Sequence, residues 1–144
     1  MYEDCEDDDI YKCISIAAPY LELVEEMTLQ EFLHFHNGLK KWLPSVSTKK
    51  IISILQLEKA ADKQIRYFSS GMKQRVKLAQ AIFSNVPVIL LDEPATNLDG
   101  EGILLYKDLV NNYCKDRLLI VSSNDKQEYD FCNEVIDMKE INTT

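Results

Sequence analysis

One stretch of the sequence, residues 68–99, restricts what this chain can fold into more than any other. It reads F-S-S-G-M-K-Q-R-V-K-L-A-Q-A-I-F-S-N-V-P-V-I-L-L-D-E-P-A-T-N-L-D. The continuous apolar run of residues 86–91 is typical of a strand that is covered on both faces in a parallel sheet. Two adjacent carboxylates, Asp92 and Glu93, follow it directly, at the end of a strand where ligands bind in open α/β sheets. The stretch therefore predicts an α/β fold with an acidic site at the carboxyl edge of its sheet.

The same stretch contains a turn of small residues, Ser69-Ser70-Gly71, just before a predicted helix that starts at about Met72. Backbone N–H groups at a helix N-terminus attract anions, and small residues let a phosphate approach closely. The simpler interpretation is a serine N-cap, which is the commoner use of such a turn. These residues alone leave both interpretations open.

The rest of the chain alternates predicted helices with predicted strands. Helices are expected over residues 28–41, 48–56, 72–84 and 100–114, and a short one follows the capping-box spacing of residues 125–128. Strands are expected over residues 13–18, 86–91, 117–122 and 134–138, the second and third of them buried. The alternation after residue 86 indicates an α/β layer, and the mostly helical residues 28–67 indicate a separate subdomain.

The first predicted helix begins with a capping box, T-L-Q-E. In such a box the Thr28 hydroxyl accepts from the backbone N–H of Glu31, and the Glu31 side chain bonds back. The periodicity places Leu39 and His36 on the buried face. We expect His34 and His36 to be partly buried helix residues, not metal ligands or catalysts.

The net charge of −8 argues against nucleic acid as a partner, because phosphate binding needs clustered Lys and Arg. Six acids lie within the first nine residues and are expected to form a solvated terminus. The N-terminus has no basic segment followed by an apolar core. No apolar run approaches the ~20 residues that span a bilayer. The chain is therefore expected to be cytoplasmic.

Residues 68–99 resemble the signature motif, Walker B motif and D-loop of ABC-type ATPases, in that order and at that spacing. The resemblance extends over about residues 13–140. It implies the C-terminal part of a P-loop NTPase domain, with a helical subdomain beside a mostly parallel sheet. The implied function is ATP binding and hydrolysis, coupled to transport through a membrane subunit. Such a subunit would hold the chain peripherally at the inner face of the membrane.

This resemblance divides a single, partial ATPase domain into three segments. Residues 1–27 form the acidic N-terminus and a Q-loop-like segment. Residues 28–85 form the helical subdomain with the signature motif. Residues 86–144 carry the Walker B motif, the D-loop and the switch loop.

The resemblance also assigns residues that act across an ATPase dimer. In the family, the signature motif of one domain covers the γ-phosphate of ATP that is bound to the other domain. That role falls here on Ser69, Ser70, Gly71 and Met72, although Met72 stands where many members have glutamine. The D-loop, Asn97-Leu98-Asp99, contacts the second ATPase domain, which is a copy of the same chain or a related one.

The catalytic residues implied by the resemblance follow two of the predicted strands. Asp92 corresponds to the acid that holds Mg²⁺, and Glu93 to the general base that acts on the attacking water. Asn124 takes the place of the usual switch-loop histidine, and its amide can donate a hydrogen bond but cannot carry a proton. A plain turn residue is the alternative for Asn124. Pro19 stands where a Q-loop glutamine would contact Mg²⁺ and water.

The largest departure from the family is that these residues contain no P-loop. The motif G-x-x-x-x-G-K-[ST] cradles nucleotide phosphates, and none of the four glycines is followed by lysine and a hydroxyl residue. We therefore expect an N-terminally truncated transporter ATPase that is inactive alone. One alternative is a non-catalytic half-domain that supplies its signature motif in trans to a partner's P-loop. A lesser alternative is the C-terminal lobe of an SMC-like chromosome ATPase.

Overall fold

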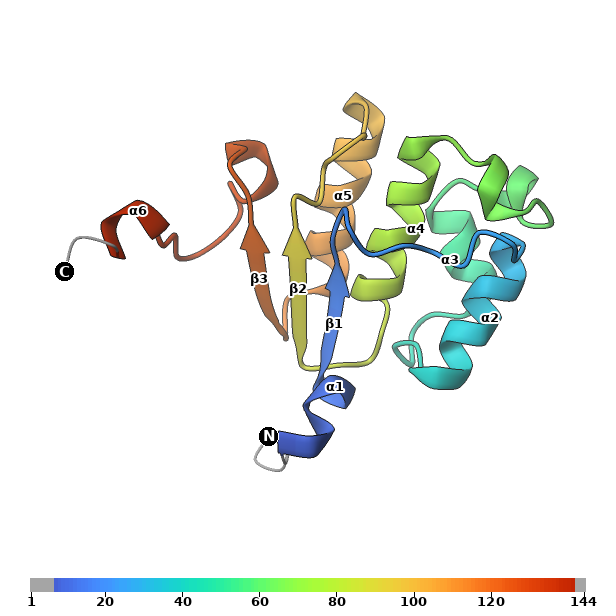
Figure 1. Cartoon of the computed structure of the whole chain (residues 1–144), viewed down its shortest axis with the longest axis horizontal. Coiled ribbons are helices and arrows are strands. Elements are labelled where there is room, and N and C mark those ends of the chain that lie inside the picture. The colour runs from blue at the N-terminus through green and yellow to red at the C-terminus, as the bar shows by residue number, and fades with distance from the viewer. Residues whose placement is uncertain (1–6, 142–144) are drawn as a thin grey trace.

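The computed structural model describes residues 7–141, which fold into a three-stranded sheet with helices beside it (Figure 1). The strands are β1 (Ile14–Ala17), β2 (Val88–Asp92) and β3 (Leu118–Ser122). They are parallel and adjacent in the order β1-β2-β3. The α/β fold class predicted from the sequence is thus confirmed, and all three carboxyl ends lie at one edge of the sheet.

The helices agree with the prediction to within a few residues at most of their ends. The α-helices are α1 (Ile10–Cys13), α2 (Leu29–Leu39), α3 (Thr48–Ile54), α4 (Ser70–Ile82), α5 (Gly100–Tyr113) and α6 (Met138–Ile141). Short 3-10 helices are η1 (Asp7–Asp9), η2 (Glu58–Ala60), η3 (Ile65–Tyr67) and η4 (Lys126–Glu128). The first six residues of the acidic N-terminal run lie outside the described residues.

Within residues 7–141, helices cover one face of the sheet and leave the other face open. α4 packs against β1 and β2, α5 packs against α4, and both lie on the same side of the strands (Figure 1). Ile89 and Leu91 point to this side and are fully buried. On the opposite face two rows of aliphatic side chains stand in register, formed by Ile14, Val88 and Leu118 and by Ile16, Leu90 and Ile120.

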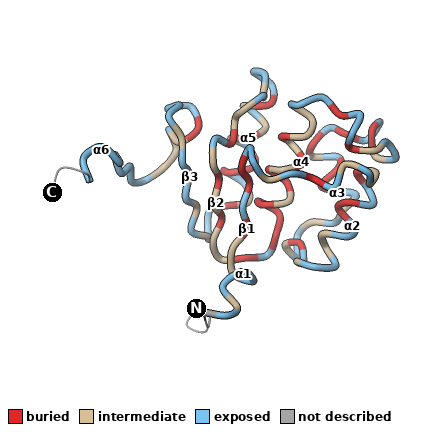
Figure 2. The backbone as a smooth tube through the Cα atoms, viewed as in Figure 1, coloured by how far each residue is buried: buried red, intermediate tan, exposed pale blue. Residues whose placement is uncertain are grey.

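The prediction that residues 86–91 are covered on both faces is therefore wrong, because Val88 and Leu90 of β2 lie on the open face and are only half-buried. The prediction that β3 is a buried strand is wrong as well. Its residues alternate between exposed and half-buried, and Leu118 and Ile120 are 57% and 49% exposed. Figure 2 shows the same change across the sheet, from red segments in β1 and β2 to tan and blue in β3. An all-apolar run predicts a strand that could be covered twice, but only packing decides whether a second layer is present.

The prediction of a last strand over residues 134–138 is also wrong. These residues are irregular up to the short helix α6, and Val135 and Ile136 are 67% and 72% exposed. The segment extends away from the sheet (Figure 1). A strand exists only where a neighbouring strand satisfies its N–H and C=O groups, and within residues 7–141 no strand pairs with this segment.

Residues 28–67 are mostly helical and pack around α2 and α3. Both bonds of the predicted capping box are present, from Glu31 N–H to Thr28 Oγ1 at 3.2 Å and from Thr28 N–H to Glu31 Oε2 at 3.4 Å. Fully buried side chains join α2, α3 and η3 into one core, among them Leu33, Ile51 and Ile65. Leu39 departs from the prediction and is 74% exposed, because α2 ends there and its successor Lys40 is already extended.

Candidate functional site: the carboxyl edge and the signature turn

The turn of small residues forms the first turn of α4. Ser69 is the N-cap, and its Oγ accepts from the backbone N–H of Met72 at 3.2 Å. The simpler interpretation of this turn as a serine cap is thus confirmed, and it leaves other donors available. The N–H groups of Ser70 and Gly71 have no partner within the helix, and both serine side chains are exposed.

Gly71 brings this turn against the loop that follows β2. A Cβ atom built on Gly71 would lie 3.0 Å from the backbone oxygen of Asn97. Such a distance is tighter than ordinary side-chain contacts, so glycine permits the close approach. The signature turn and the D-loop are therefore in direct contact.

The paired carboxylates leave the sheet in different directions. Asp92 is the last residue of β2, lies opposite Ser122 of β3, and is half-buried. Glu93 has a φ of 44° and is exposed, and its N–H donates to Ser122 O at 2.9 Å. A left-handed residue other than glycine is strained. The left-handed conformation of Glu93 turns the chain out of the sheet directly after Asp92.

The loop of residues 94–99 is held by its own turns. Thr96 N–H donates to Glu93 O at 3.1 Å, and Leu98 N–H donates to Ala95 O at 3.0 Å. Asn97 has a φ of 64°, a conformation that asparagine tolerates better than most residues. Asp99 is the N-cap of α5 and accepts from Gly102 N–H at 2.8 Å.

Asn124 lies in the loop after β3 and is exposed. Ser123 shapes this loop, because its Oγ accepts from the N–H of Asp125 at 2.9 Å. The predicted capping box of residues 125–128 is wrong: Asp125 caps the N–H of Gln127 at 3.0 Å, and the Glu128 side chain turns inward instead. Since β2 and β3 are adjacent and parallel, Asp92, Glu93 and Asn124 belong to the same edge of the sheet.

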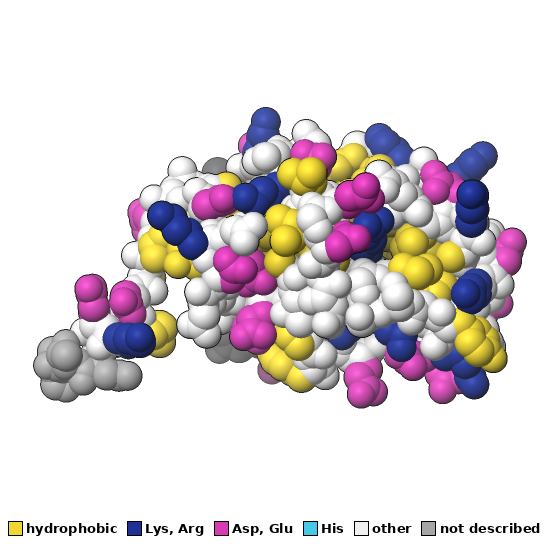
Figure 3. All heavy atoms as spheres, turned by 90° about the horizontal axis from the view of Figure 1, so that it is seen from above, with side chains coloured by type: hydrophobic (Ala, Val, Ile, Leu, Met, Phe, Trp, Pro, Cys, Tyr) yellow, Lys and Arg dark blue, Asp and Glu magenta, His cyan; other side chains and the backbone are white. Residues whose placement is uncertain are grey.

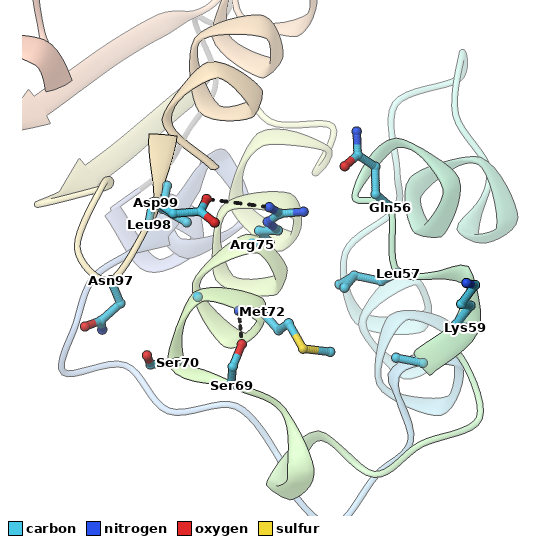
Figure 4. Close-up of a pocket in the computed structure, with 12 residues that line it drawn as sticks. Gln56, Leu57, Lys59, Ser69, Ser70, Met72, Arg75, Asn97, Leu98 and Asp99 are labelled. Carbon is cyan, nitrogen blue, oxygen red and sulfur yellow. Dashed lines mark hydrogen bonds and ion pairs between the residues drawn. The ribbon is translucent and has the colours of Figure 1, made fainter. Parts of the chain in front are cut away.

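A cleft of about 550 Å³ lies between the helical subdomain, the signature turn and the D-loop (Figure 4). Its walls include Ser69, Ser70, Gly71 and Met72 on one side and Asn97, Leu98 and Asp99 on another, with Gln56, Leu57, Lys59, Ala60 and Arg75 completing the lining. The structure thus brings together the residues predicted to act across a dimer. Asp92, Glu93 and Asn124 do not line this cleft.

Arg75 connects the walls of the cleft and was not singled out by the sequence analysis. Its Nη1 donates to the Leu55 carbonyl at the end of α3, at 3.2 Å. Its Nη2 lies 4.0 Å from Asp99 Oδ1, the contact drawn as a dashed line in Figure 4. A single arginine therefore links the helical subdomain, α4 and the N-terminus of α5. The sequence did offer a sign of its importance, because Arg75 directly follows Gln74 in the stretch that resembles the signature motif.

Pro19 lies at the start of the segment between β1 and α2. Its carbonyl oxygen accepts from Lys77 Nζ at 3.2 Å, and Glu25 Oε1 accepts from Lys73 Nζ at 2.5 Å. Both lysines belong to α4. The segment is thus attached to the signature helix, but a proline offers no side-chain amide to a ligand.

Comparisons with known proteins agree with this geometry. A family model described as ABC transporter matches residues 6–96, well over half of the chain. An uncharacterised ABC transporter ATP-binding protein of Bacillus subtilis is 32% identical over 132 residues, which are 89% of this chain. This chain belongs to the family of ABC transporter ATP-binding domains.

Other members of the ABC transporter family show the same partial overlap. A cytochrome c biogenesis ATP-binding export protein of Xylella fastidiosa is 36% identical over 88 residues, 61% of this chain and 40% of that protein. An ABC transporter A family member of Dictyostelium discoideum is 30% identical over 135 residues, 90% of this chain and 16% of that protein. The Bacillus subtilis protein is covered to 45%. The chain thus spans less than half the length of these relatives.

The fold of this ABC domain resembles a solved structure, the dimeric form of a bacterial ABC transporter cassette. The TM-score is 0.66 at 24% sequence identity, over 90% of this chain and 62% of the cassette. Among residues 7–141 no helix is long and apolar enough to cross a membrane.

Members of this family bind nucleotide, typically with Mg²⁺, and the donor set of the ABC domain fits that ion in part. The described residues contain no group of three or more His, Cys, Asp or Glu side chains that could hold a metal by themselves. Mg²⁺ usually takes one or two carboxylates together with substrate phosphates. Asp92, half-buried at the end of β2, offers such a carboxylate.

Proposed function

We propose that this chain is part of the ATP-binding component of an ABC transporter, in which ATP hydrolysis drives transport through a membrane subunit. The contact between Gly71 and Asn97 at a common cleft is the observation that carries the proposal. It joins two motifs that, in the family, face the second ATPase domain. A turn with unpaired N–H groups at the positive end of a thirteen-residue helix favours a phosphate.

In this proposal the signature turn acts on a nucleotide held by another domain. Ser69, Ser70 and Gly71 supply hydroxyl and N–H donors to the terminal phosphate, and Met72 packs beside it. Residues 97–99 contact the second ATPase domain. The cations of the cleft, Lys59 and Arg75, favour an anionic ligand by simple charge attraction.

The carboxyl edge of the sheet supplies the hydrolytic groups in this proposal. Mg²⁺, when bound with nucleotide, would neutralise phosphate charge beside Asp92. Glu93 is exposed and aimed out of the sheet by its left-handed backbone, which suits a general base that takes a proton from water. Asn124 donates a hydrogen bond to a phosphate oxygen and takes no proton.

We further propose two partners. A second ATPase domain completes the site, and a membrane subunit docks on the helical subdomain, residues 28–67, at the inner face of the membrane. The protein is then peripheral to the membrane. The Bacillus subtilis and Xylella fastidiosa relatives are named as ATP-binding proteins of ABC transporters or exporters, which supports this assignment.

The decisive experiment uses a complex of this chain with a P-loop-bearing ATPase domain. Glu93→Gln should lower ATP turnover by about 10²–10⁴-fold, the usual contribution of a positioned acid or base. Glu101→Gln, an exposed acid in the first turn of α5, is the matched control and should leave turnover unchanged. Equal rates for the Glu93→Gln variant and the wild type would refute the catalytic role.

A second candidate function is a regulatory half-domain that donates its signature turn without catalysis of its own. The lack of a P-loop in these residues favours it. The chain would then co-purify with a P-loop-bearing protein, and Ser69→Arg would abolish the complex. Ser53→Arg, an exposed serine on α3, should not. The relatives reported above are transporters and give no support to a chromosome-type ATPase.

A further inference from the structure

The Glu128 side chain is a buried carboxylate surrounded by neutral partners. It is 4% exposed, and no lysine, arginine or histidine among the described residues forms an ion pair with it. Burying a charge is costly unless hydrogen bonds compensate. The bonds to its two oxygens therefore show what this carboxylate holds in place.

Those two oxygens accept from two different loops. Oε1 accepts from the backbone N–H of Ala95, in the loop after β2, at 2.7 Å. Oε2 accepts from the hydroxyl of Ser123, in the loop after β3. Ser123 in turn accepts from Asp125 N–H, so both neighbours of Asn124 are fixed.

The signature helix α4 holds the other side of the Pro94–Ala95 peptide, whose N–H is bonded to Glu128. Gln74 of α4 is 3% exposed, and its Nε2 donates to the Pro94 carbonyl at 2.8 Å. The Pro94 carbonyl and the Ala95 N–H belong to one peptide. That peptide is thus clamped by Gln74 at its oxygen and by Glu128 at its nitrogen.

We propose that Glu128 is a positioning residue that joins the loop of residues 94–99, which contains the D-loop, to the loop carrying Asn124, with Gln74 attaching the signature helix at the same Pro94–Ala95 peptide. A well-packed apolar side chain is often as stabilising as a buried charge, so the value of the carboxylate lies in its two directed bonds. Movement of the D-loop by a partner domain then shifts Asn124 and α4 together. This functional meaning rests on the proposed function, whereas the mechanical coupling does not.

The test changes Ser123 in the loop after β3 and measures amide hydrogen exchange at Ala95 in the loop after β2. Ser123→Ala removes the hydroxyl that donates to Glu128 but leaves the Glu128 carboxylate in place, so its bond to the Ala95 N–H can still form. If the two loops form one unit, amide hydrogen exchange at Ala95 in the full chain, followed by NMR, should rise about fivefold, the factor of one typical net hydrogen bond. Ser122→Ala is the matched control: this exposed serine is the preceding residue and should leave Ala95 within about twofold of wild type.

Two variants at Glu128 complete the test. Glu128→Gln keeps an acceptor for Ala95 and gains a donor for Ser123, so its exchange at Ala95 should match the wild type. Glu128→Leu removes both bonds and should raise that exchange at least tenfold. If Glu128→Leu does not fold, Ser123→Ala decides alone. Unchanged exchange at Ala95 in Ser123→Ala, with a faster Asp125 amide, would mean that the loops are independent and would overturn the proposal.

The exchange measurements need neither nucleotide nor partner, so they separate this inference from the proposed function. In an active complex with a P-loop-bearing domain, Ser123→Ala should lower kcat several-fold and leave KM unchanged. Coupled exchange without any ATP turnover by the complex would leave the positioning role standing and the proposed function wrong. ATP turnover by the complex, combined with unchanged exchange at Ala95 in Ser123→Ala, would support the proposed function and overturn the positioning role of Glu128.

Discussion

Single residues decide how closely the functional loops approach one another. Gly71 lies where α4 meets the D-loop, and a Cβ atom at this position would lie 3.0 Å from Asn97 O, which is tighter than ordinary side-chain contacts. Gly38, in α2, faces the opposite situation, because a Cβ there would have no atom within 4 Å. The two glycines therefore respond in opposite ways to the same substitution.

We expect Gly71→Ala to lower the free energy of unfolding by about 1–2 kcal/mol, because overpacking outweighs the better helix propensity of alanine. Gly38→Ala should raise it by about 0.4–1 kcal/mol, because alanine reduces the conformational entropy of the unfolded chain at a position whose backbone it can adopt. Urea denaturation of both variants measures the difference. A Gly71→Ala variant as stable as the wild type would mean that the loop retreats without cost.

Stability toward acid should depend on His36. Its ring stacks on Trp42 at 4.7 Å between centroids, and its Nε2 lies 2.9 Å from Ser84 Oγ. Burial, helped by the charge of Lys40, lowers the pKa of His36 from 6.5 to about 4. The expectation of a partly buried residue is met for His36, whereas His34 is exposed.

A histidine with a lowered pKa destabilises the folded state when acid protonates it. Between pH 6.5 and about 4 the unfolded chain binds the proton and the folded chain does not, so stability falls as pH falls through this range. After allowance for solvent screening the loss is about 1–2 kcal/mol. His36→Phe should remove this part of the pH dependence in denaturation experiments. His34→Gln, in the same helix, should retain it.

At the scale of secondary-structure elements, the open face of the sheet is the least protected surface. Its exposed members include Ile16, Leu118 and Ile120, which are 40%, 57% and 49% exposed. Contiguous apolar patches of this kind promote association. β3 is also an end strand of the described sheet, and unpaired strand edges add to that tendency.

We expect the chain to self-associate in the micromolar range and to bind hydrophobic dyes, because burying these side chains removes apolar surface from water. The double variant Leu118→Thr, Ile120→Thr should weaken association at least tenfold in sedimentation experiments, since about 1–2 kcal/mol of apolar burial is lost per side chain. Leu104→Gln removes an equally exposed leucine from α5 and should change little. Association unaffected by the double variant would assign it to another surface.

Some features of the helices and strands could be predicted from the sequence, and others could not. Helix starts were predictable to within a few residues at Thr28, Ser69 and Asp99, each of which caps its helix. Burial of β3 and the strand at residues 134–138 were not, because both depend on neighbours rather than on the residues themselves. Glu128 was assigned to a local cap, while its actual partners lie in another loop.

At the scale of the whole molecule, the carboxyl edge of the sheet presents Glu93, Asn97 and Asn124 as exposed residues. In Figure 3, which looks down on this end, acidic and basic side chains are interspersed, not gathered in one stripe. The cleft beside the signature turn is lined by only part of the residues that the family uses. In the proposed function, a working site requires groups that these residues do not contain, above all a P-loop.

We expect the purified chain alone to bind MgATP weakly and to turn it over at less than about one thousandth of the ~10 s⁻¹ typical of enzymes. The reason is that no lysine-bearing glycine loop is present to hold the phosphates. A coupled phosphate-release assay measures this, with Glu93→Gln as the control for contaminating activity. Turnover that disappears in Glu93→Gln would prove the expectation wrong.

The sequence by itself determined the family and the α/β class, because these depend on local patterns: capped helices, apolar runs and paired carboxylates. Only the tertiary structure decided which face of the sheet is covered, that Gly71 touches the D-loop, and that Glu128 and Gln74 clamp one peptide. The physical reason is that each of these features requires residues far apart in the chain to meet. Their meeting depends on the packing of α4 against the sheet, which no local pattern specifies.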